Sequence, residues 1–517
     1  MALKLSHLAV PSKNPAWIVL APLLQPHLRT HLPGWIYERI NLATHGWEFR
    51  KKGEIHRRLG KTFVLVTLDE CSLWVAEPAL GTTILQRRKD FVQPAVVARV
   101  VGIFGSNVLQ SNGDDWQRQR RIVAPNLNER ISETVWNESC QQAQVMIDYL
   151  LKHPGNQTLS GLRCLAINVI GAAGYGQHAP WRPDVQELAQ GWKDGSGRGA
   201  YFNTIGLVAD MFLEAAIVPT KLMKMWFMPA CWQLLGKCKE KMPEYTKQVL
   251  DEERKAAKEG SETHSNLLSM LVRFSDDRKS AGSSGLSLTD DEISGNLFVF
   301  SAAGFDTTAN TMGYAVMLLA AYPKWQDWLR EELLGLDSDA STWQYEESFP
   351  KCTRTLALMF ETLRLFTPVA HATRSVAGPQ QLADDTRTHL LLPPMDVFVS
   401  SQSLHADVDI WGPDFLEFNP SRWIDANGQM ITPMKGAFLP WSGGPRVCPG
   451  MKMSQVEFVS TIATLFRLSR CEPMTAGSGS IEDSCKRLKA IMNDSNPKLT
   501  LQVHDPAQVN LRWILQA

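Results

Sequence analysis

Hydrophobic positions between residues 290 and 322 are not confined to one face of a helix. The stretch NLFVFSAAGF is apolar on all sides, and Thr289 and Glu292 ahead of it have the spacing of a capping box. Pro323 ends the pattern. The segment is therefore predicted to form one helix of about 33 residues, ~50 Å long, which passes through the core instead of lying on its surface.

Strand-like patterns occur near both ends of the chain. Residues 63 to 68, FVLVTL, and the following SLWVAEP predict a short hairpin, and KLTLQV at 498 to 503 predicts another strand. Residues 275 to 285 are polar and glycine-rich, so we expect a surface loop there. Much of the remainder has helical periodicity, and no internal repeat is visible. The pattern predicts a mainly α architecture with a small β component.

Composition narrows the function classes. The 517 residues include 53 Lys+Arg and 53 Asp+Glu, so the net charge is zero and nucleic-acid binding is not indicated. Hydrophobic residues make up 44% of the chain, which is enough for a substantial core. The nine cysteines are scattered and form no CxxC pair, which favours neither a disulfide framework nor a zinc site. A reducing compartment is the simpler interpretation.

The N-terminal segment carries a short apolar run, PAWIVLAPLL at residues 15 to 24. A spanning helix needs about 20 apolar residues, and Pro22 interrupts this one. We therefore expect at most a weak interfacial anchor. The run also lacks a small-residue cleavage pattern, so secretion is not supported.

The predicted central helix is interrupted by polar residues at 302 to 310, AAGFDTTAN. One interpretation is a stripe facing solvent, with its hydroxyls bonded to carbonyls four residues earlier. The other is a local widening of the helix that holds a small ligand and water. In the second case Asp306 and Thr307 could relay protons, and Gly304 would let a flat molecule approach the backbone.

Two further segments place charged residues on helical faces. In FETLRLFTP, Glu361 and Arg364 are three apart. They form either a surface pair or a buried pair, and the largely apolar helix favours burial. If the pair is buried, Arg422 of FNPSRW could be a third member that shares the Glu361 carboxylate. In DDWQRQRR, Trp116 and Arg120 are four apart. They belong to a basic surface helix or, if an acidic cofactor is present, donate to its carboxylates.

The stretch WSGGPRVCPG surrounds Cys448 with glycine and proline. Pro449 suits the first position of a helix, so the sulfur is predicted to lie at a helix N-terminus, which favours a thiolate. Gly443 and Gly444 supply a tight turn and Arg446 a cation. An inert buried thiol is the alternative. A nucleophilic cysteine would want a histidine base, and no local arrangement supplies one.

Together these segments resemble the cytochrome P450 haem-thiolate monooxygenases, whose signature is Phe-x-x-Gly-x-Arg-x-Cys-x-Gly. The chain has Trp441 in place of the Phe and matches the other positions at Gly444, Arg446, Cys448 and Gly450. The other segments resemble family motifs in the same order, over roughly residues 60 to 510. The resemblance implies the P450 fold, a single large domain with haem between the long central helix and the cysteine loop. We expect a catalytic domain at 61–517 after an N-terminal segment, 1–60.

The resemblance also implies roles for individual residues. Cys448 would be the axial ligand of haem b, donating electron density that favours O–O cleavage. Asp306 and Thr307 would deliver protons. The propionate contacts would be Trp116, Arg120, Arg374 and Arg446, and the structural cluster Glu361, Arg364 and Arg422. The substrate pocket would be lined by Phe298, Ala302, Val369, Ala370 and the loop 95–110.

The implied reaction uses O2 and electrons from NADPH. No flavin or nicotinamide fingerprint occurs in the sequence, so a separate NADPH-cytochrome P450 reductase is expected. It would dock near the cysteine loop, with Lys452 and the arginines of RQRR as contacts. The substrate would be a small hydrophobic organic molecule that is hydroxylated, epoxidised or oxidatively coupled. RRKDFVQP and RRIVAPNLNE resemble filamentous-fungal members, many of them in secondary metabolism. The cytosolic face of the endoplasmic reticulum membrane is the expected location, with the cytosol as the alternative.

Two other functions fit parts of the pattern. A haem-thiolate isomerase or dehydratase would rearrange a peroxide without O2, and a haem-binding protein would have no turnover. Asp306 and Thr307 favour the monooxygenase, because peroxide rearrangement needs no proton relay. Trp441 departs from the family. Its N–H beside the thiolate is predicted to weaken electron donation and raise the haem potential.

Overall fold

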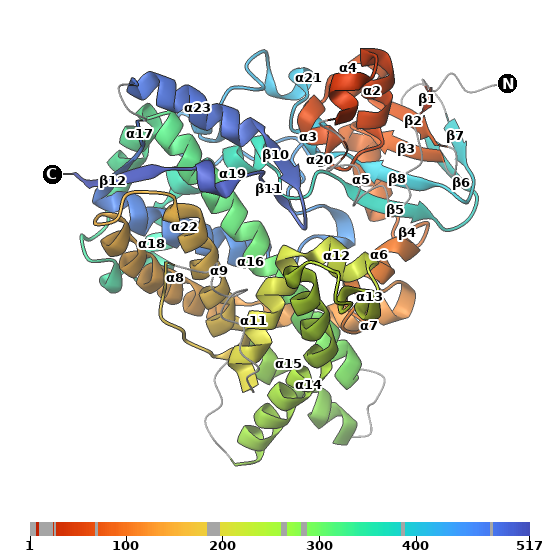
Figure 1. Cartoon of the computed structure of the whole chain (residues 1–517), viewed down its shortest axis with the longest axis horizontal. Helices are drawn as coiled ribbons and strands as arrows, with labels where there is room; N and C mark the ends of the chain where they lie inside the picture. The colour runs from red at the N-terminus through yellow and green to blue at the C-terminus, as the bar shows by residue number, and fades with distance from the viewer. Residues whose placement is uncertain are drawn as a thin grey trace. The chain divides into compact units, whose positions relative to one another are not determined.

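The structure is a computed structural model with two compact units (Figure 1). Unit 1 comprises residues 1–100, 363–418 and 432–448, and unit 2 comprises 101–362, 419–431 and 449–517. The residues that the structure describes are 7–9, 24, 27–67, 71–183, 197–259, 266–280, 287–383, 388–475 and 479–516.

Unit 1 holds a six-stranded sheet in the order β1-β2-β3-β8-β5-β4. Its strands are β1 (His7–Ala9), β2 (Thr62–Val66), β3 (Cys71–Val75), β4 (Phe91–Val92), β5 (Ala372–Val376) and β8 (Asp396–Val399). A separate hairpin pairs β6 (Gln380–Ala383) with β7 (Thr388–Leu391). β2 and β3 are antiparallel, which confirms the predicted hairpin.

The helices of unit 1 are α2 (Gly34–Leu42), α3 (Trp47–Lys51), α4 (Glu54–Leu59), α5 (Pro78–Gln86), α20 (Ser401–Leu404) and α21 (Val408–Trp411). Leu80, Ile84 and Leu85 of α5 are buried in one core cluster with Val397 and Val399 of β8. Because its apolar face is fixed against the sheet, α5 provides a rigid support for the chain that packs on it.

Unit 2 is mainly helical. Its helices are α7 (Gly113–Val123), α8 (Glu129–Leu150), α9 (Gln157–Tyr175), α11 (Gly197–Asp210), α12 (Phe212–Ile217), α13 (Thr220–Met223), α14 (Ala230–Lys258), α15 (Leu267–Ser280), α16 (Asp290–Ala321), α17 (Lys324–Leu333), α18 (Tyr345–Ser348), α22 (Met451–Arg467) and α23 (Ile481–Asn493). Two small antiparallel pairs join β9 (Ser469–Pro473) to β12 (Leu511–Leu515) and β10 (Ser495–Pro497) to β11 (Leu501–Val503). The chain passes between the units within α6 (Ala95–Val101) and α19 (Thr353–Leu365), and again after residues 418, 431 and 448.

α16 is the predicted central helix. The Thr289 hydroxyl accepts from the Glu292 N–H at 3.1 Å, and the Glu292 carboxylate accepts from the Thr289 N–H at 2.9 Å, which completes the capping box. α16 packs against α9, α11, α22 and α23, and most of its side chains are buried (Figure 1). The prediction that this helix runs through a core is confirmed within unit 2.

Three local predictions need correction or lie outside the described residues. Residues 275 to 280 are not loop, because α15 continues to Ser280; the Ser275 hydroxyl accepts from the Leu288 N–H at 3.2 Å. The rest of that predicted loop, like the apolar run at 15 to 23, is outside the described residues. α22 begins at Met451 with Gly450 as its N-cap, so Pro449 precedes the helix instead of opening it.

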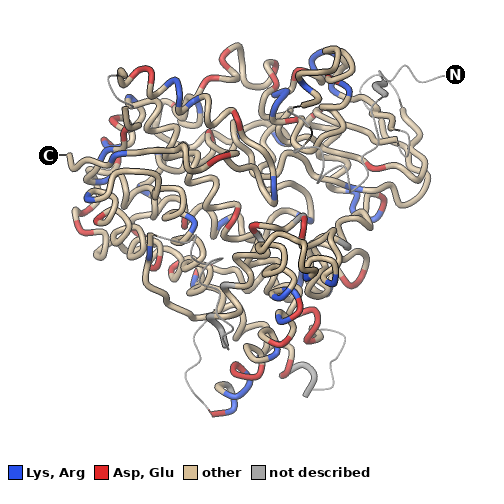
Figure 2. Tube along the Cα trace, in the orientation of Figure 1, with Lys and Arg blue, Asp and Glu red and all other residues tan. Residues whose placement is uncertain are grey.

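Acidic and basic side chains are interspersed along α14, and the view shows no continuous basic stripe there (Figure 2). Among the described residues, no helix combines the length and the apolar composition needed to cross a bilayer.

Candidate active site

The cysteine loop of unit 1 presents Cys448 as an exposed thiol that forms no disulfide. Its backbone N–H donates to the Trp441 carbonyl at 2.9 Å. Gly444 has φ +65°, and a Cβ there would lie 2.4 Å from the carbonyl oxygen of Leu85 in α5. Glycine is therefore required at this position both for the left-handed backbone and for the close approach to α5. The loop keeps its shape because it rests on a helix that the core of unit 1 holds in place.

Arg374 lies on β5 of the same unit and is only 4% exposed. Its guanidinium donates to the Thr373 carbonyl at 2.7 Å, and no ion pair of Arg374 occurs among the described residues. Burial lowers its pKa to about 10. A buried cation without a carboxylate partner suits an anionic ligand. An exposed thiol and such a cation in one unit fit a haem, which needs an axial ligand and partners for its propionates.

The Glu361 carboxylate is completely buried in unit 2. It accepts from Arg422 Nε at 3.1 Å, from the Asn419 N–H at 3.0 Å and from Trp423 Nε1 at 3.0 Å. The predicted contact between Arg422 and Glu361 is therefore present. The alternative of a surface pair is excluded, because burial of this carboxylate requires these donors.

Arg364, also fully buried, belongs to unit 1 and donates to backbone carbonyls there. Nη1 lies 2.9 Å from the His405 carbonyl oxygen and 2.5 Å from that of Phe415, and Nη2 lies 3.2 Å from that of Glu417. A guanidinium spreads its donors in a fixed plane, so one side chain fixes three points of the segment 405–417.

The polar interruption of α16 does not widen the helix, which is unbroken from Asp290 to Ala321. Its hydroxyls bond back to carbonyls four residues earlier, with Thr307 to Ala303 at 2.8 Å and Thr308 to Gly304 at 3.0 Å. The hydrogen bonds of the first interpretation are therefore present, but the stripe does not face solvent as a whole, because Asp306 and Thr308 are buried. The predicted widening is wrong. Ala303 is exposed and Thr307 half-buried, so these residues, four apart, form the accessible face here.

Asp306 has partners that its sequence neighbourhood did not indicate. The carboxylate is 2% exposed and accepts from Arg163 Nη1 of α9 at 2.7 Å and from the Thr500 hydroxyl at 2.6 Å. Arg163 also donates to Asp210 at the end of α11. Arg163 and Thr500 lie far away along the chain, and no local spacing could have identified them. Asp306 is thus held in an ion pair, on a different side of α16 from Thr307.

The loop after α6 packs along the first half of α16 in unit 2. Phe104 meets Phe298 edge to face at 4.7 Å between ring centroids, and the Val108 N–H donates to the Asn296 side chain at 3.0 Å. A Cβ on Gly295 would lie 2.3 Å from the Ser106 carbonyl oxygen. The expected neighbourhood of this loop and Phe298 is present, but residues 95–101 of the predicted loop form α6 instead. Their role in binding substrate stays a prediction.

The remaining pocket candidates differ in accessibility. Ala302 is 3% exposed and faces the interior of unit 2, whereas Val369 of unit 1 is 50% exposed. Ala370 is half-buried, and its carbonyl accepts from the Gln402 N–H at 3.0 Å. On accessibility, the neighbouring Ala303 is the better candidate on α16, and the sequence interpretation missed it.

α7 places Trp116 and Arg120 on one face, with Trp116 buried and Arg120 half-buried. Arg118 makes a bidentate pair with Glu292 at 2.5 and 2.8 Å, and its expected contact with a reductase stays a prediction. Lys452 is half-buried, with its ammonium 4.0 Å from the centroid of the Phe349 ring. The Arg118–Glu292 ion pair therefore attaches α7 to the start of α16. The arginines of α7 differ in that Arg118 is committed to this pair.

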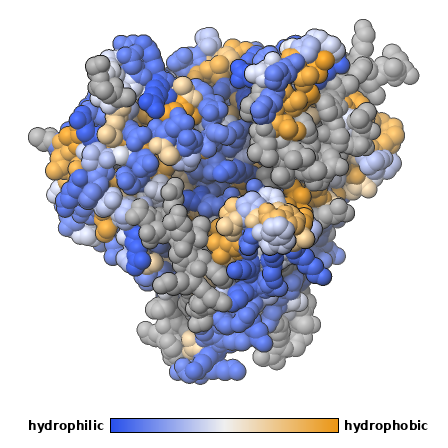
Figure 3. All heavy atoms as spheres, viewed as in Figure 1, coloured by the Kyte–Doolittle hydropathy of each residue, from blue (hydrophilic) through white to orange (hydrophobic). Residues whose placement is uncertain are grey.

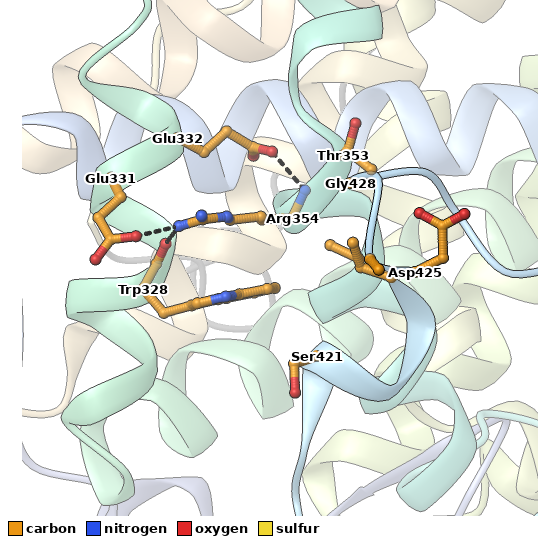
Figure 4. Close-up of a pocket in the computed structure, with 10 residues that line it drawn as sticks. Trp328, Glu331, Glu332, Thr353, Arg354, Ser421, Asp425 and Gly428 are labelled. Carbon is orange, nitrogen blue, oxygen red and sulfur yellow. Dashed lines mark hydrogen bonds and ion pairs between the residues drawn. The ribbon is translucent and has the colours of Figure 1, made fainter.

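A pocket of about 460 Å³ opens in unit 2 beside α17, α19 and the segment 421–428 (Figure 4). Arg354 lies over the Trp328 ring and pairs with Glu331 at 2.6 Å. Glu332 accepts from the backbone N–H groups of Arg354 and Thr355 and so caps α19; burial raises its pKa. These charged groups are already partnered, and no predicted site residue lines this pocket.

The predicted site residues divide between the units. Unit 1 carries Cys448, Trp441, Gly444, Arg446, Arg374, Arg364, Val369 and Ala370. Unit 2 carries Asp306, Thr307, Trp116, Arg120, Glu361, Arg422, Gly450, Phe298 and Ala302. Within unit 1, an exposed thiol on a glycine-dependent loop and an unmatched buried arginine are the features expected of a haem-thiolate protein.

Comparison with known proteins identifies the family. The cytochrome P450 family model matches residues 33–501. A phomenoic acid biosynthesis cluster cytochrome P450 monooxygenase from Leptosphaeria maculans is 30% identical, with 92% of this chain and 88% of that protein aligned. The cytochrome P450 monooxygenase prx9 of Penicillium rubens is 25% identical over 87% of this chain and 82% of its own length. The crystal structure of the cytochrome P450 CYP102L1 has the same fold, with TM-score 0.69, 17% identity and coverage of 90% and 94%.

The chain belongs to the cytochrome P450 family and is a monooxygenase of that family. The predicted fold is confirmed. Membership implies a haem ligated by a cysteine thiolate, a redox partner and a small hydrophobic substrate. The division at residues 60 and 61 stays a prediction; the family match begins at residue 33, and Leu42, Trp47 and Ile55 are buried in unit 1.

Proposed function

We propose that this monooxygenase uses O2 and electrons from an NADPH-dependent reductase to oxidise a small hydrophobic molecule in fungal secondary metabolism. Cys448, exposed at the signature position, is the observation that carries the proposal. Bound haem would supply oxygen activation, which a thiolate ligand promotes. Arg374, Arg446, Trp116 and Arg120 would bind the propionates.

Protons would be delivered from α16. The Thr307 hydroxyl lies on the accessible face of this helix, whereas the Asp306 carboxylate is directed to Arg163 and Thr500. A proton path through Asp306 therefore requires the carboxylate to exchange Arg163 for a partner on the Thr307 side. Arg163 is in this sense part of the proposed proton supply.

The relatives support a role in secondary metabolism, because one of them is named for a phomenoic acid biosynthesis cluster. The accessible Ala303 and Val369 are small and apolar, in keeping with a hydrophobic substrate. Hydroxylation, epoxidation and oxidative coupling are all within this proposal. Comparing the metabolites of the host organism with and without the gene would identify the product.

The ligand assignment is tested by the spectrum of the reduced, carbon-monoxide-bound protein. We expect the strongly red-shifted thiolate band. Haem-containing protein without that band would overturn the assignment of Cys448.

The proton role is tested with Thr307→Ala, using Thr308→Ala as the control because Thr308 makes the same back-bond but is buried. We expect Thr307→Ala to raise the share of NADPH-derived electrons that ends in hydrogen peroxide by about tenfold or more. The reason is that loss of a general acid typically costs about 10²–10⁴ in rate. Equal coupling in both variants would contradict the proposal.

We also propose that the protein contacts a membrane on the cytosolic face of the endoplasmic reticulum. Apolar side chains gather where α12 and α13 reach the surface (Figure 3). After α13, Trp226 is 88% exposed, Phe227 53% and Met225 42%, with Lys221 close by. Aromatic residues beside lysines suit the interface of an anionic bilayer.

Flotation with vesicles containing anionic phospholipid tests the membrane contact. Trp226→Ser with Phe227→Ser is expected to reduce the bound fraction several-fold. Trp35→Ser is the control, since Trp35 is 65% exposed in unit 1. Unchanged flotation of the double variant would refute this surface.

A further inference from the structure

His405 is a completely buried histidine that follows α20 in unit 1. Its Nε2 accepts a hydrogen bond from the Leu439 backbone N–H at 2.9 Å, so the neutral ring carries its proton on Nδ1. Burial and the nearby Arg364 lower the pKa of His405 to about 3. The ring therefore remains an acceptor over the whole physiological range of pH.

Both backbone polar groups of Leu439 are held by α20 and the residue that follows it. The Ser401 hydroxyl donates to the Leu439 carbonyl at 3.2 Å, while His405 accepts from its N–H. Ser401 and His405 are four residues apart, and the His405 N–H donates to the Ser401 carbonyl at 2.9 Å, which puts their side chains on one face. Leu439 is thus fixed by a two-point clamp.

The clamp lies at the start of the cysteine loop. The Ser442 N–H donates to the Leu439 carbonyl at 3.0 Å and closes a turn, and the Trp441 carbonyl within that turn accepts from the Cys448 N–H at 2.9 Å. Ser442 has φ +62°, an uncommon value for a residue other than glycine. The position of Leu439 therefore sets the position of the turn, and the turn holds the cysteine backbone.

The backbone carbonyl of His405 and the face of its ring also have contacts, whereas its Nδ1 has no hydrogen-bond partner among the described residues. Arg364 Nη1 donates to the His405 carbonyl at 2.9 Å, and the Phe438 ring packs against the imidazole at 5.1 Å between centroids. A continuous path of hydrogen bonds and short covalent segments leads from Arg364 through His405, Leu439 and Trp441 to Cys448. Each step lies within unit 1.

We propose that His405 is a positioning residue for the iron ligand, acting through the Leu439 N–H to hold the Cys448 loop in the geometry that binds haem through sulfur. This inference rests on the proposed role of Cys448. Arg364 holds the His405 backbone in place, and the hydrogen bond from the Leu439 N–H to the His405 ring then fixes the loop to that anchored residue.

Two amide substitutions separate positioning from general packing. The Gln side chain can place an oxygen near the position of Nε2, whereas the shorter Asn reaches only the position of Nδ1 and leaves the buried Leu439 N–H unpaired. We expect His405→Gln to keep the ratio of thiolate band to total haem in the carbon-monoxide complex within about twofold of wild type. We expect His405→Asn to lower that ratio about fivefold or more.

The control is His56→Asn. His56 is a buried histidine in the same unit, its ring bonded to the Lys61 carbonyl at 3.2 Å, away from the path to Cys448. The His56→Asn substitution should lower thermal stability without changing the ratio of thiolate band to total haem. Limited proteolysis of haem-free protein gives a readout that needs no bound haem, and His405→Asn should speed cleavage in 439–448 relative to His405→Gln.

Equal band ratios and cleavage rates for the two His405 variants would overturn the inference. If neither variant accumulates as folded protein, His405→Ser with added imidazole replaces them, and the absence of rescue of the band would count against the inference. If wild-type protein binds haem but lacks the thiolate band, the ligand assignment itself fails. That outcome is distinct from a wild-type band that is insensitive to His405.

Discussion

The cysteine loop and the polar interruption of α16 both carry family motifs, yet they are stabilised in different ways. The loop is held by backbone hydrogen bonds and by close packing of Gly444 on α5, and its reactive group is exposed. In α16 the carboxylate is buried and held by side chains from α9 and from residue 500. The folded loop already exposes the Cys448 sulfur, whereas the Asp306 carboxylate must first break its ion pair with Arg163 before it can act.

The largest effect is expected for Cys448→Ser, which removes the group that the loop presents. Since a hydroxyl is a poor replacement for a thiolate ligand, the thiolate band of the carbon-monoxide complex should disappear entirely. Cys71→Ser, a partly buried cysteine of the same unit, should leave the spectrum unchanged. A surviving band in Cys448→Ser would place the ligand elsewhere.

Breaking the ion pair of α16 should have the next largest effect. Arg163→Met leaves the Asp306 charge buried and unpaired, so the free energy of unfolding should fall by about 3–5 kcal/mol in a denaturant titration. Asp210→Asn removes the other carboxylate that pairs with Arg163. Because the Asp210 side chain is 55% exposed, the free energy of unfolding should fall by less than about 1 kcal/mol. Equal losses would mean that Asp306 does not depend on Arg163.

Gly444→Ala tests the backbone support of the loop. The new Cβ would meet the Leu85 carbonyl in a left-handed conformation, and we expect a loss of about 3 kcal/mol together with weaker haem retention. Gly428→Ala is the matched control. Gly428 has φ +78° but an open surrounding, so only the backbone cost of about 1 kcal/mol should appear. Similar values for both would show that contact with α5 is unimportant.

The smallest effect is expected at Trp441, which is half-buried and whose carbonyl, not its ring, holds the Cys448 N–H. Trp441→Phe should lower the haem reduction potential modestly, since an N–H beside the sulfur would reduce its donation. Potentiometric titration measures this change. An unchanged potential would dismiss the prediction for this departure from the family signature.

How well a feature could be predicted from the sequence depended on how far apart its interacting residues lie along the chain. The capping box of α16, the β2–β3 hairpin and the glycine turn before Cys448 depend on near neighbours, and short patterns identified them. The Glu361–Arg422 contact spans 61 residues; it was proposed because a buried carboxylate needs partners, and the family pattern then supported it.

The missed features depend on tertiary contacts. Arg163, Thr500 and His405 acquire their roles from chain segments that no local spacing connects to them. The polarity of residues 275 to 280 indicated a loop, but those residues extend α15, because polar side chains are compatible with a helix end as well as with a loop. Widening of α16 was one of two interpretations of its composition, and it is wrong, because the back-bonded threonines leave the helix regular.

The contact between Gly105 and Gly295 has a consequence for how this enzyme can diversify. Because a side chain at either position would collide with the opposing backbone, the loop cannot slide along α16 by even one residue. Insertions and deletions in this loop must then be absorbed at its ends, while the register at 104–108 is kept. If the predicted substrate contact of this loop holds, substrate preference would change more readily by exchanging side chains at 104–108 than by changing the length of the loop.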